Sequence, residues 1–253
     1  MKNDIKALVE NVALLGYRHL ANQGAIFLSD RKIVRNILKE NIPDSYYEDL
    51  HTDLKAKVMF VDGICDMIFI AVGSLSKLVY EYTLNKDYAV ASFESLLVEL
   101  DPEESKLFKD IQKWNLDRGL VSYIDSLEFD MFIEEMGETL GLEPTDYKKL
   151  LPEHTSANTV VTVEVLIEML RNIQGIMNEL NQVCPKDSQS YLYFLNVVLE
   201  ANNRKGKVKN KDGKVVKDNK FESPDQTIAS YIKAYEREHG ENIFGKLICE
   251  RVA

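Results

Sequence analysis

The chain has 253 residues, of which 45% are hydrophobic and 28% are charged, as in an ordinary soluble protein with a sizeable core. Its formal net charge of −10 argues against nucleic acid as a partner, because phosphate binding needs a basic face. The three cysteines (Cys65, Cys184, Cys249) show no C-x-x-C spacing and no even count, which argues against a zinc site or a disulfide framework. Such cysteine usage favours a reducing, cytoplasmic setting.

The chain shows no sign of membrane targeting. Its first residues lead into a helix interrupted by Glu10, rather than into the uninterrupted apolar run of a secretory signal. The longest apolar stretch, Met67 to Val72, is far shorter than the roughly 20 residues that span a bilayer. We therefore expect a soluble protein with no membrane partner.

Apolar residues recur at helical spacing almost everywhere, which predicts an all-α fold. In the first half, the predicted helices are 5–16, 33–38 after a Ser29-Asp30 cap, 44–54 leading into the apolar segment 61–78, and 92–98. In the second half, they are 108–116, 120–140, 163–180, 190–203 and 226–238, the last capped by Ser223-Pro224-Asp225 and ended by His239-Gly240.

A basic segment interrupts the helical pattern. Residues 204–217 contain seven cations and an Asp212-Gly213 turn between short β-prone pieces. This composition predicts a β-hairpin-like tail near 205–220. A solvated arm is the alternative, and the sequence leaves both open.

Residues 61–78 and 163–180 resemble two copies of one helix. Asp62 aligns with Glu164 and Asp66 with Glu168, at a common offset (164 − 62 = 102). Weaker similarity extends the duplication to about 1–106 and 107–207. We therefore predict a first repeat over 1–106 and a second over 107–253, the latter including the basic tail and C-terminal helix, intertwined in one globular unit.

Two acidic motifs carry the candidate chemistry. Asp62 and Asp66 lie one turn apart at the head of an apolar helix, where carboxylates repel one another unless a cation lies between them. Glu134, Glu135 and Glu138 form an E-E-x-x-E motif within a predicted helix. Together the five acids would supply the oxygen ligands that Mg²⁺ needs. Acidic runs on helices are also often solvated faces, which is the competing interpretation.

This combination resembles the MazG-like all-α nucleoside triphosphate pyrophosphohydrolases, which include phage-type phosphoribosyl-ATP pyrophosphohydrolase-like proteins and the dimeric dUTPases. The family pattern is E-E-x-x-E on one helix, an acidic pair on the next, and a helix with Asn and Lys. Phage-type members add a D-G-K-x-x-K…P-D tail. The corresponding residues here are Glu134-Glu135-x-x-Glu138, Asp62-x-x-x-Asp66, Asn202-Asn203-Arg204-Lys205, and Asp212-Gly213-Lys214-x-x-Lys217 followed by Pro224-Asp225.

The resemblance implies a duplicated four-helix bundle that hydrolyses a (deoxy)nucleoside triphosphate to the monophosphate and pyrophosphate, in nucleotide-pool control or phage DNA metabolism. It implies Mg²⁺, with Mn²⁺ as an alternative ion, and metal ligation and catalysis by Asp62, Asp66, Glu134, Glu135 and Glu138. Asn202, Asn203 and Lys205 match positions that contact phosphate or sugar, and Arg204 would help to neutralise a triphosphate. A basic helix end that complements the helix dipole is the structural alternative. Trp114, Tyr123 and Phe129 are candidates either for base stacking or for the core.

The order of the motifs departs from the family. The E-E-x-x-E motif follows Asp62 by 72 residues (134 − 62 = 72), whereas in the family it precedes the acidic pair. We therefore predict a composite site that joins the intact half-site of each repeat. The rival arrangement pairs the E-E-x-x-E motif with Glu164 and Glu168 of the second repeat. A catalytically degenerate nucleotide-binding relative, and a helical scaffold that docks an acidic partner, are the alternative functions. The sequence leaves homodimer formation open.

Overall fold

The computed structural model describes residues 2–23, 30–83, 86–120, 126–151, 161–183, 190–210, 215–217, 221–240 and 242–244. The predicted all-α fold is confirmed, since these residues form ten α-helices and a 3₁₀ turn. The elements are α1 (Lys2–Asn22), α2 (Arg31–Asn41), α3 (Asp44–Thr52), α4 (Leu54–Thr83), α5 (Lys86–Leu96), α6 (Pro102–Asp117), α7 (Ser126–Thr139), η2 (Tyr147–Leu150), α8 (Val163–Val183), α9 (Ser190–Arg204) and α10 (Asp225–His239).

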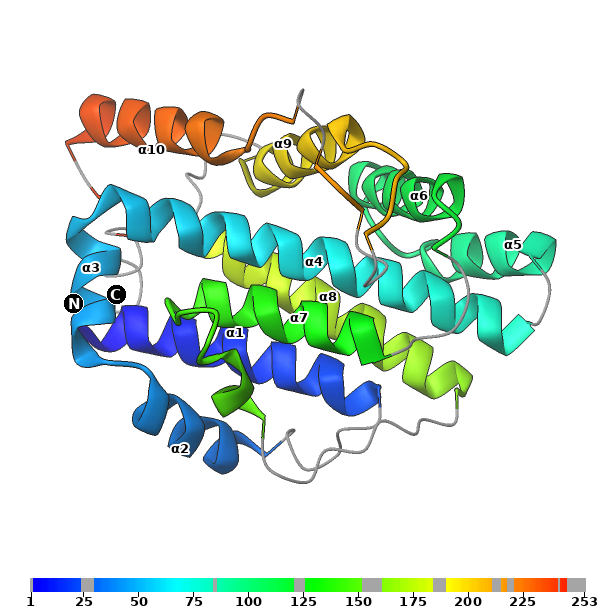
Figure 1. Cartoon of the computed structure of the whole chain (residues 1–253), viewed down its shortest axis with the longest axis horizontal. Coiled ribbons are helices and arrows are strands. Elements are labelled where there is room, and N and C mark those ends of the chain that lie inside the picture. The colour runs from blue at the N-terminus through cyan, green and yellow to red at the C-terminus, as the bar shows by residue number, and fades with distance from the viewer. Residues whose placement is uncertain are drawn as a thin grey trace.

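Four helices, α1, α4, α7 and α8, form the centre of the molecule and run roughly parallel to one another (Figure 1). Helix α4 packs against both α7 and α8, and α1 packs against α8. The apolar side chains of these helices meet in one continuous core. Because α4 belongs to the first predicted repeat and α7 and α8 to the second, the two halves of the chain share this core.

Helix α4 is the central element of the fold. It has 30 residues, and most of its side chains between Lys57 and Val79 are buried. By length and composition it is, among the described residues, the one helix that could cross a membrane. In this structure, however, 78% of its most apolar window is buried inside the protein. The same composition is expected of a helix surrounded by others on all sides.

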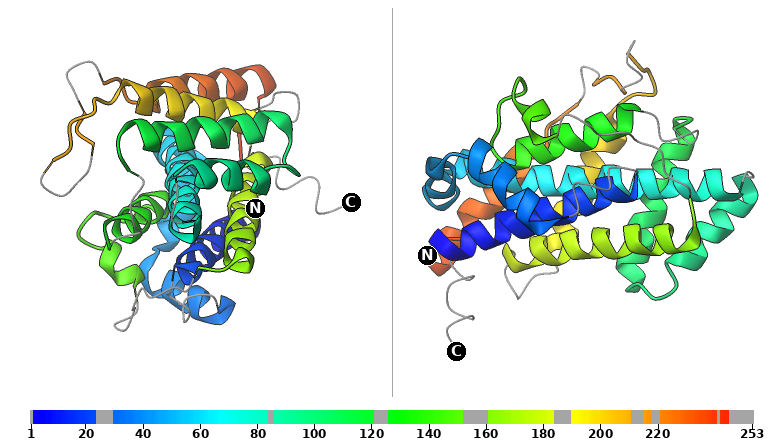
Figure 2. Two further views of the ribbon diagram at one scale, coloured as in Figure 1. Left: turned by 90° about the vertical axis from the view of Figure 1, so that its right-hand side faces the viewer. Right: turned by 90° about the horizontal axis from the view of Figure 1, so that it is seen from below.

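A second layer of helices covers α4 on the side away from α1. Figure 2 shows α9 and α10 lying next to each other above α4, with α6 beside them. Helices α2 and α3 cover the opposite side near the N-terminus (Figure 1). This arrangement brings the last turn of α9 and the first turn of α10 close to the part of α4 that contains Asp62 and Asp66.

Local signals in the sequence set several helix boundaries. The side chain of Asp30 accepts hydrogen bonds from the backbone N–H groups of Lys32 and Ile33, which confirms the predicted cap of α2. Gly240 ends α10 in the left-handed conformation, as predicted (φ 65°). The helix predicted over 120–140 differs at Leu120, which is not helical, whereas residues 121–125 lie outside the described residues. Gly119 has φ +64° and forms a left-handed turn after α6, and the described part of α7 spans Ser126–Thr139.

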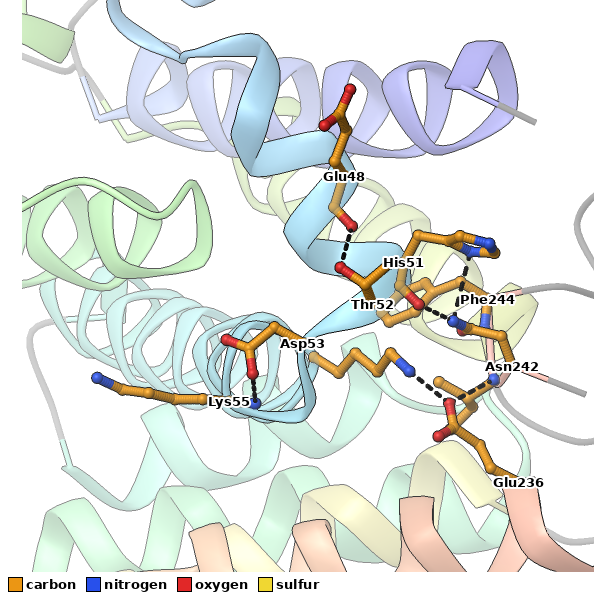
Figure 3. Close-up of polar contacts among 10 residues, drawn as sticks. Glu48, His51, Thr52, Asp53, Lys55, Glu236, Asn242 and Phe244 are labelled. Atoms are coloured by element: carbon orange, nitrogen blue, oxygen red, sulfur yellow. Dashed lines mark hydrogen bonds and ion pairs between the residues drawn. The ribbon is translucent and has the colours of Figure 1, made fainter.

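The C-terminal end of the described chain is tied to the junction of α3 and α4 (Figure 3). The ammonium group of Lys57 lies 2.6 Å from a carboxylate oxygen of Glu236, and the same oxygen accepts a hydrogen bond from the Ile243 N–H at 3.2 Å. The side-chain amide of Asn242 donates to the His51 carbonyl, and the Phe244 ring packs edge-on against Phe60. These contacts fix α10 along α4.

The basic segment after α9 has one feature of a hairpin. Lys209 and Val215 form an isolated antiparallel bridge, and the Val216 N–H donates to the Val208 carbonyl at 2.8 Å. The predicted Asp212-Gly213 turn lies outside the described residues. The β-hairpin-like tail and the internal duplication both stay predictions.

A candidate metal and phosphate site between helices

A pocket of about 540 Å³ lies beside α4, between α7 on one side and the ends of α6, α9 and α10 on the other. All five predicted acids line it: Asp62 and Asp66 from α4, and Glu134, Glu135 and Glu138 from α7. Three lysines, Lys205, Lys209 and Lys217, line the same pocket from the segment at and after the end of α9. We call the part lined by the five carboxylates the acidic end of the pocket.

The two acidic motifs meet because α4 and α7 approach closely. Gly63 faces the backbone of Thr139, and a Cβ atom added to Gly63 would lie 3.1 Å from the Thr139 Cα. The Thr139 hydroxyl donates to the Glu135 carbonyl at 2.7 Å, and the Thr139 carbonyl accepts a hydrogen bond from the Tyr46 hydroxyl. Gly63 lies between Asp62 and Asp66 in the sequence. The absence of its side chain therefore brings this stretch of α4 against the end of the E-E-x-x-E helix.

The carboxyl groups at the acidic end destabilise one another when they are ionised and no cation is near. Burial raises the pKa of Asp62 to about 9, and the charges of Asp66 and Asp225 add to the rise. Burial also raises the pKa of Glu135 well above its usual range, with Asp66 and Glu138 as the next causes. Oxygen Oδ1 of Asp62 is buried and has no hydrogen-bond partner among the described residues. A buried carboxylate in this state is stabilised when a cation approaches.

Helix α9 provides the nearest counter-charge. Burial raises the pKa of Asp66, whereas the positive charge of Lys205 and a hydrogen bond from Asn202 act in the opposite direction. Lys205 is itself partly buried, and desolvation lowers the pKa of its ammonium group although Asp66 opposes this change. Asn202, in the last turn of α9, and Lys205, the residue after its end, both line the pocket.

The structure adds one acid that sequence reasoning did not assign to the site. Asp225, the first residue of α10, lines the pocket and hydrogen-bonds with the carboxyl group of Asp62. The Ser223-Pro224-Asp225 signal identified Asp225 as part of a helix start. Its proximity to Asp62 depends on the packing of α10 along α4, which no local pattern reveals.

Other predicted residues lie elsewhere. Asn203 and Arg204 are exposed and do not line the pocket, and Arg204 pairs instead with Glu222 at 3.0 Å. They lie on the other face of α9 from Asn202 and Lys205. Of the candidate stacking residues, Trp114 lines the pocket and Phe129 is buried in the core, while Tyr123 lies outside the described residues.

The rival acids of the second repeat are separate from the pocket. Glu164 and Glu168 are both exposed and do not line it, and Glu168 pairs with Arg171 on the same helix. The structure therefore brings together the E-E-x-x-E motif and the Asp62–Asp66 pair, and not the E-E-x-x-E motif and Glu164–Glu168.

No group of three or more His, Cys, Asp or Glu side chains among the described residues is arranged closely enough to hold a metal ion directly. The carboxylates instead line the walls of an open space. Mg²⁺ commonly keeps several of its waters and binds through one or two carboxylates together with substrate phosphates. The donor set, all oxygen, and the unpartnered Asp62 oxygen fit such an ion.

Comparisons with protein-family models, with curated protein sequences and with solved structures gave no match to this chain.

Proposed function

We propose that this protein is a Mg²⁺-dependent nucleoside triphosphate pyrophosphohydrolase, which converts a (deoxy)nucleoside triphosphate and water to the monophosphate and pyrophosphate. The observation that supports the proposal best is the composition of one pocket. Five carboxylates from two helices face lysines from a third segment, although the two acidic motifs are far apart in the sequence. Carboxylates suit a divalent ion, and lysines suit the phosphates that the ion would bridge.

The residues divide into two roles. Asp62, Asp66, Glu134, Glu135 and Glu138 would hold Mg²⁺, which when bound would withdraw charge from the phosphates and favour ionisation of a water molecule. Lys205, Lys209 and Lys217 would neutralise the triphosphate. In the reaction, water attacks the α-phosphorus, the bond between this atom and the bridging oxygen breaks, and pyrophosphate leaves with that oxygen.

Glu135 is suited to bind the cation or to orient the attacking water. Its side chain is partly buried between other acids, and its pKa is raised well above that of an exposed glutamate. A pKa raised in this way means that a nearby cation favours the ionised form of the carboxyl group. Any carboxylate that does not bind the ion directly can also orient the water by accepting a hydrogen bond from it.

The test is pyrophosphate release from a panel of canonical and modified (deoxy)nucleoside triphosphates, with Mg²⁺ and with a chelator. The duplication provides a matched pair of variants, because Asp62→Asn and Glu164→Gln change corresponding positions of the two acidic helices. We expect Asp62→Asn to lower kcat/KM by about 100-fold or more and Glu164→Gln to leave it unchanged. Equal turnover by the wild type and Asp62→Asn would exclude the composite site.

A nucleotide-binding relative without catalysis would give a different result. Wild-type protein with unchanged circular dichroism would then release no pyrophosphate from any nucleotide, yet nucleotide would raise its Tm. An enzyme gains stability from Mg²⁺ and nucleotide together. A scaffold gains none from either ligand.

A further inference from the structure

The pocket continues beyond the carboxylates into a second compartment of different chemistry. Its walls are formed by Phe69 and Ile70 of α4, Trp114 of α6, Leu120 after α6, and Met131 of α7, and we call this the apolar end of the pocket. Phe69 and Trp114 pack edge to face, with ring centroids 5.0 Å apart. The Arg118 guanidinium lies over the indole of Trp114, 4.1 Å from its centroid, so a ligand cannot stack on that face.

Two polar side chains, Asn115 and Lys77, line this end of the pocket. Asn115 lines the pocket and is only 6% exposed. Its amide nitrogen donates to the Ile111 carbonyl at 3.0 Å, whereas its amide oxygen has no hydrogen-bond partner among the described residues. Because the nitrogen is held by the backbone of its own helix, the orientation of the amide is fixed and Oδ1 remains as an acceptor.

The main chain of α4 makes room for this amide. A Cβ atom at Gly73 would lie 3.1 Å from the Asn115 nitrogen and 3.6 Å from its oxygen. Asn115 therefore packs directly over the backbone at Gly73. Gly73 lies seven residues beyond Asp66 on α4, which corresponds to roughly 10 Å along the helix axis. This separation leaves room for a sugar between a phosphate at the acidic end and a ring at the apolar end.

We propose that the apolar end binds the nucleobase and that the Asn115 oxygen accepts a hydrogen bond from an N–H group of that base, so that Asn115 determines base specificity. This inference rests on the proposed function and adds the group that selects among its substrates. The aliphatic and aromatic walls suit the ring of a base, and an acceptor that a bound ring covers without donating to it disfavours that ring. The preferred substrates are therefore nucleotides whose base presents an N–H at the end of the compartment.

The test compares each base with an analogue that lacks the N–H group, through loss of an amino group or through N-methylation. The pairs are adenine with purine, cytosine with 2-pyrimidinone, and uracil with 3-methyluracil, each as the triphosphate. We expect the wild type to lose about tenfold in kcat/KM on removal of the N–H from its preferred base. With the parent nucleotide, Asn115→Leu should have a kcat/KM lower than that of the wild type by a similar factor. Removal of the N–H from the base should then cause no further loss in kcat/KM for this variant. Equal further losses in the wild type and Asn115→Leu would overturn the proposal.

Binding can be followed without catalysis because Trp114 is the single tryptophan of the chain. We expect a non-hydrolysable nucleotide to change the Trp114 fluorescence, and inorganic tripolyphosphate, which has no base, to leave it nearly unchanged. The same change with both ligands would mean that the base does not enter the apolar end. Absence of turnover with every nucleotide would instead refute the proposed function, whereas turnover that is indifferent to the N–H refutes this inference alone.

Gly73→Ala supplies an independent variant. The added methyl group would displace the Asn115 amide while leaving its chemistry intact. We expect this variant to reduce the discrimination between each parent base and its N–H-deficient analogue. Hydrolysis with unchanged discrimination in folded Gly73→Ala would contradict the role of a fixed amide orientation.

Discussion

Asp62 on α4 and Asp225 at the start of α10 hydrogen-bond through their carboxyl groups in the wall of the pocket. Two carboxyl groups can do this only if one of them carries a proton. Burial and the neighbouring acids raise the pKa of Asp62 to about 9, so this proton is present at neutral pH. The acidic end of the metal-free protein is therefore partly neutralised by protons.

Metal binding should release protons from this end of the pocket, because a cation favours the ionised carboxylates. We expect calorimetric titration with Mg²⁺ at pH 7.5 to show proton release, measured as a dependence of the observed heat on the ionisation enthalpy of the buffer. Asp62→Asn should reduce the number of protons released. Identical heats in buffers of different ionisation enthalpy would contradict the prediction.

Replacement of Asp62 by a residue that does not titrate should stabilise the metal-free protein while it impairs the site. A raised pKa means that the folded state binds more protons than the unfolded state between about pH 4 and pH 9, so the contribution of Asp62 to stability falls as pH rises through that window. An asparagine does not titrate. We therefore expect Asp62→Asn to increase the free energy of unfolding at pH 8 by roughly 1–2 kcal/mol relative to the wild type. Urea denaturation at pH 5 and pH 8 in the presence of a chelator measures this difference, which should be smaller at pH 5.

Gly63→Ala should separate the two acidic motifs. The new methyl group would clash with the Thr139 hydroxyl, which is held by its hydrogen bond to the Glu135 carbonyl, and would lie 3.1 Å from the Thr139 Cα. We expect a loss of roughly 1–3 kcal/mol in stability and a weaker apparent affinity for Mg²⁺. Differential scanning calorimetry and metal titration measure the two effects. A variant with normal stability and normal Mg²⁺ affinity would show that close contact at Gly63 is not needed.

The Lys57–Glu236 pair should support the site from a distance. Lys57 is only 5% exposed and lies on α4, while Glu236 lies near the end of the helix whose first residue is Asp225. Glu236→Gln leaves a buried ammonium group without its charged partner, so we expect a destabilisation of about 1–3 kcal/mol. The matched surface variant Glu222→Gln removes an exposed ion pair and should cost less than about 1 kcal/mol. Equal unfolding free energies for the two variants would contradict the assignment.

His19 should make the protein sensitive to acid. The ring is fully buried, its Nε2 atom lies 2.9 Å from the Gln23 amide nitrogen, and burial lowers its pKa to about 3. Because the unfolded histidine has the higher pKa, the protein should lose roughly 1 kcal/mol of stability per pH unit as pH falls from 6.5 towards 3. We expect His19→Phe to be less stable at pH 7 but to show a smaller loss over that range. Urea denaturation at pH 7, 6, 5 and 4 compares the two slopes.

The amino-acid sequence by itself determined the helical class and many helix ends. Apolar spacing, the Asp30 cap and the Gly240 stop are local, because each depends on contacts within a few residues of the same helix. The five acids could also be selected from the sequence. Asp62 and Asp66 share one face of their helix because they are four residues apart, and the same holds for Glu134 and Glu138. The helix predicted from 120 missed the left-handed turn at Gly119, after which Leu120 is not helical.

Only the tertiary structure decided which acidic motifs meet. Asp66 and Glu168 occupy aligned positions of the two predicted repeats, but α4 packs against α7 and Asp66 lines the pocket, while Glu168 is exposed. The same is true of Asp225 and Asn115, which reach the pocket through the packing of α10 and α6 around α4. Sequence spacing specifies the face of one helix, whereas the neighbour of that face is set by the packing of the whole core.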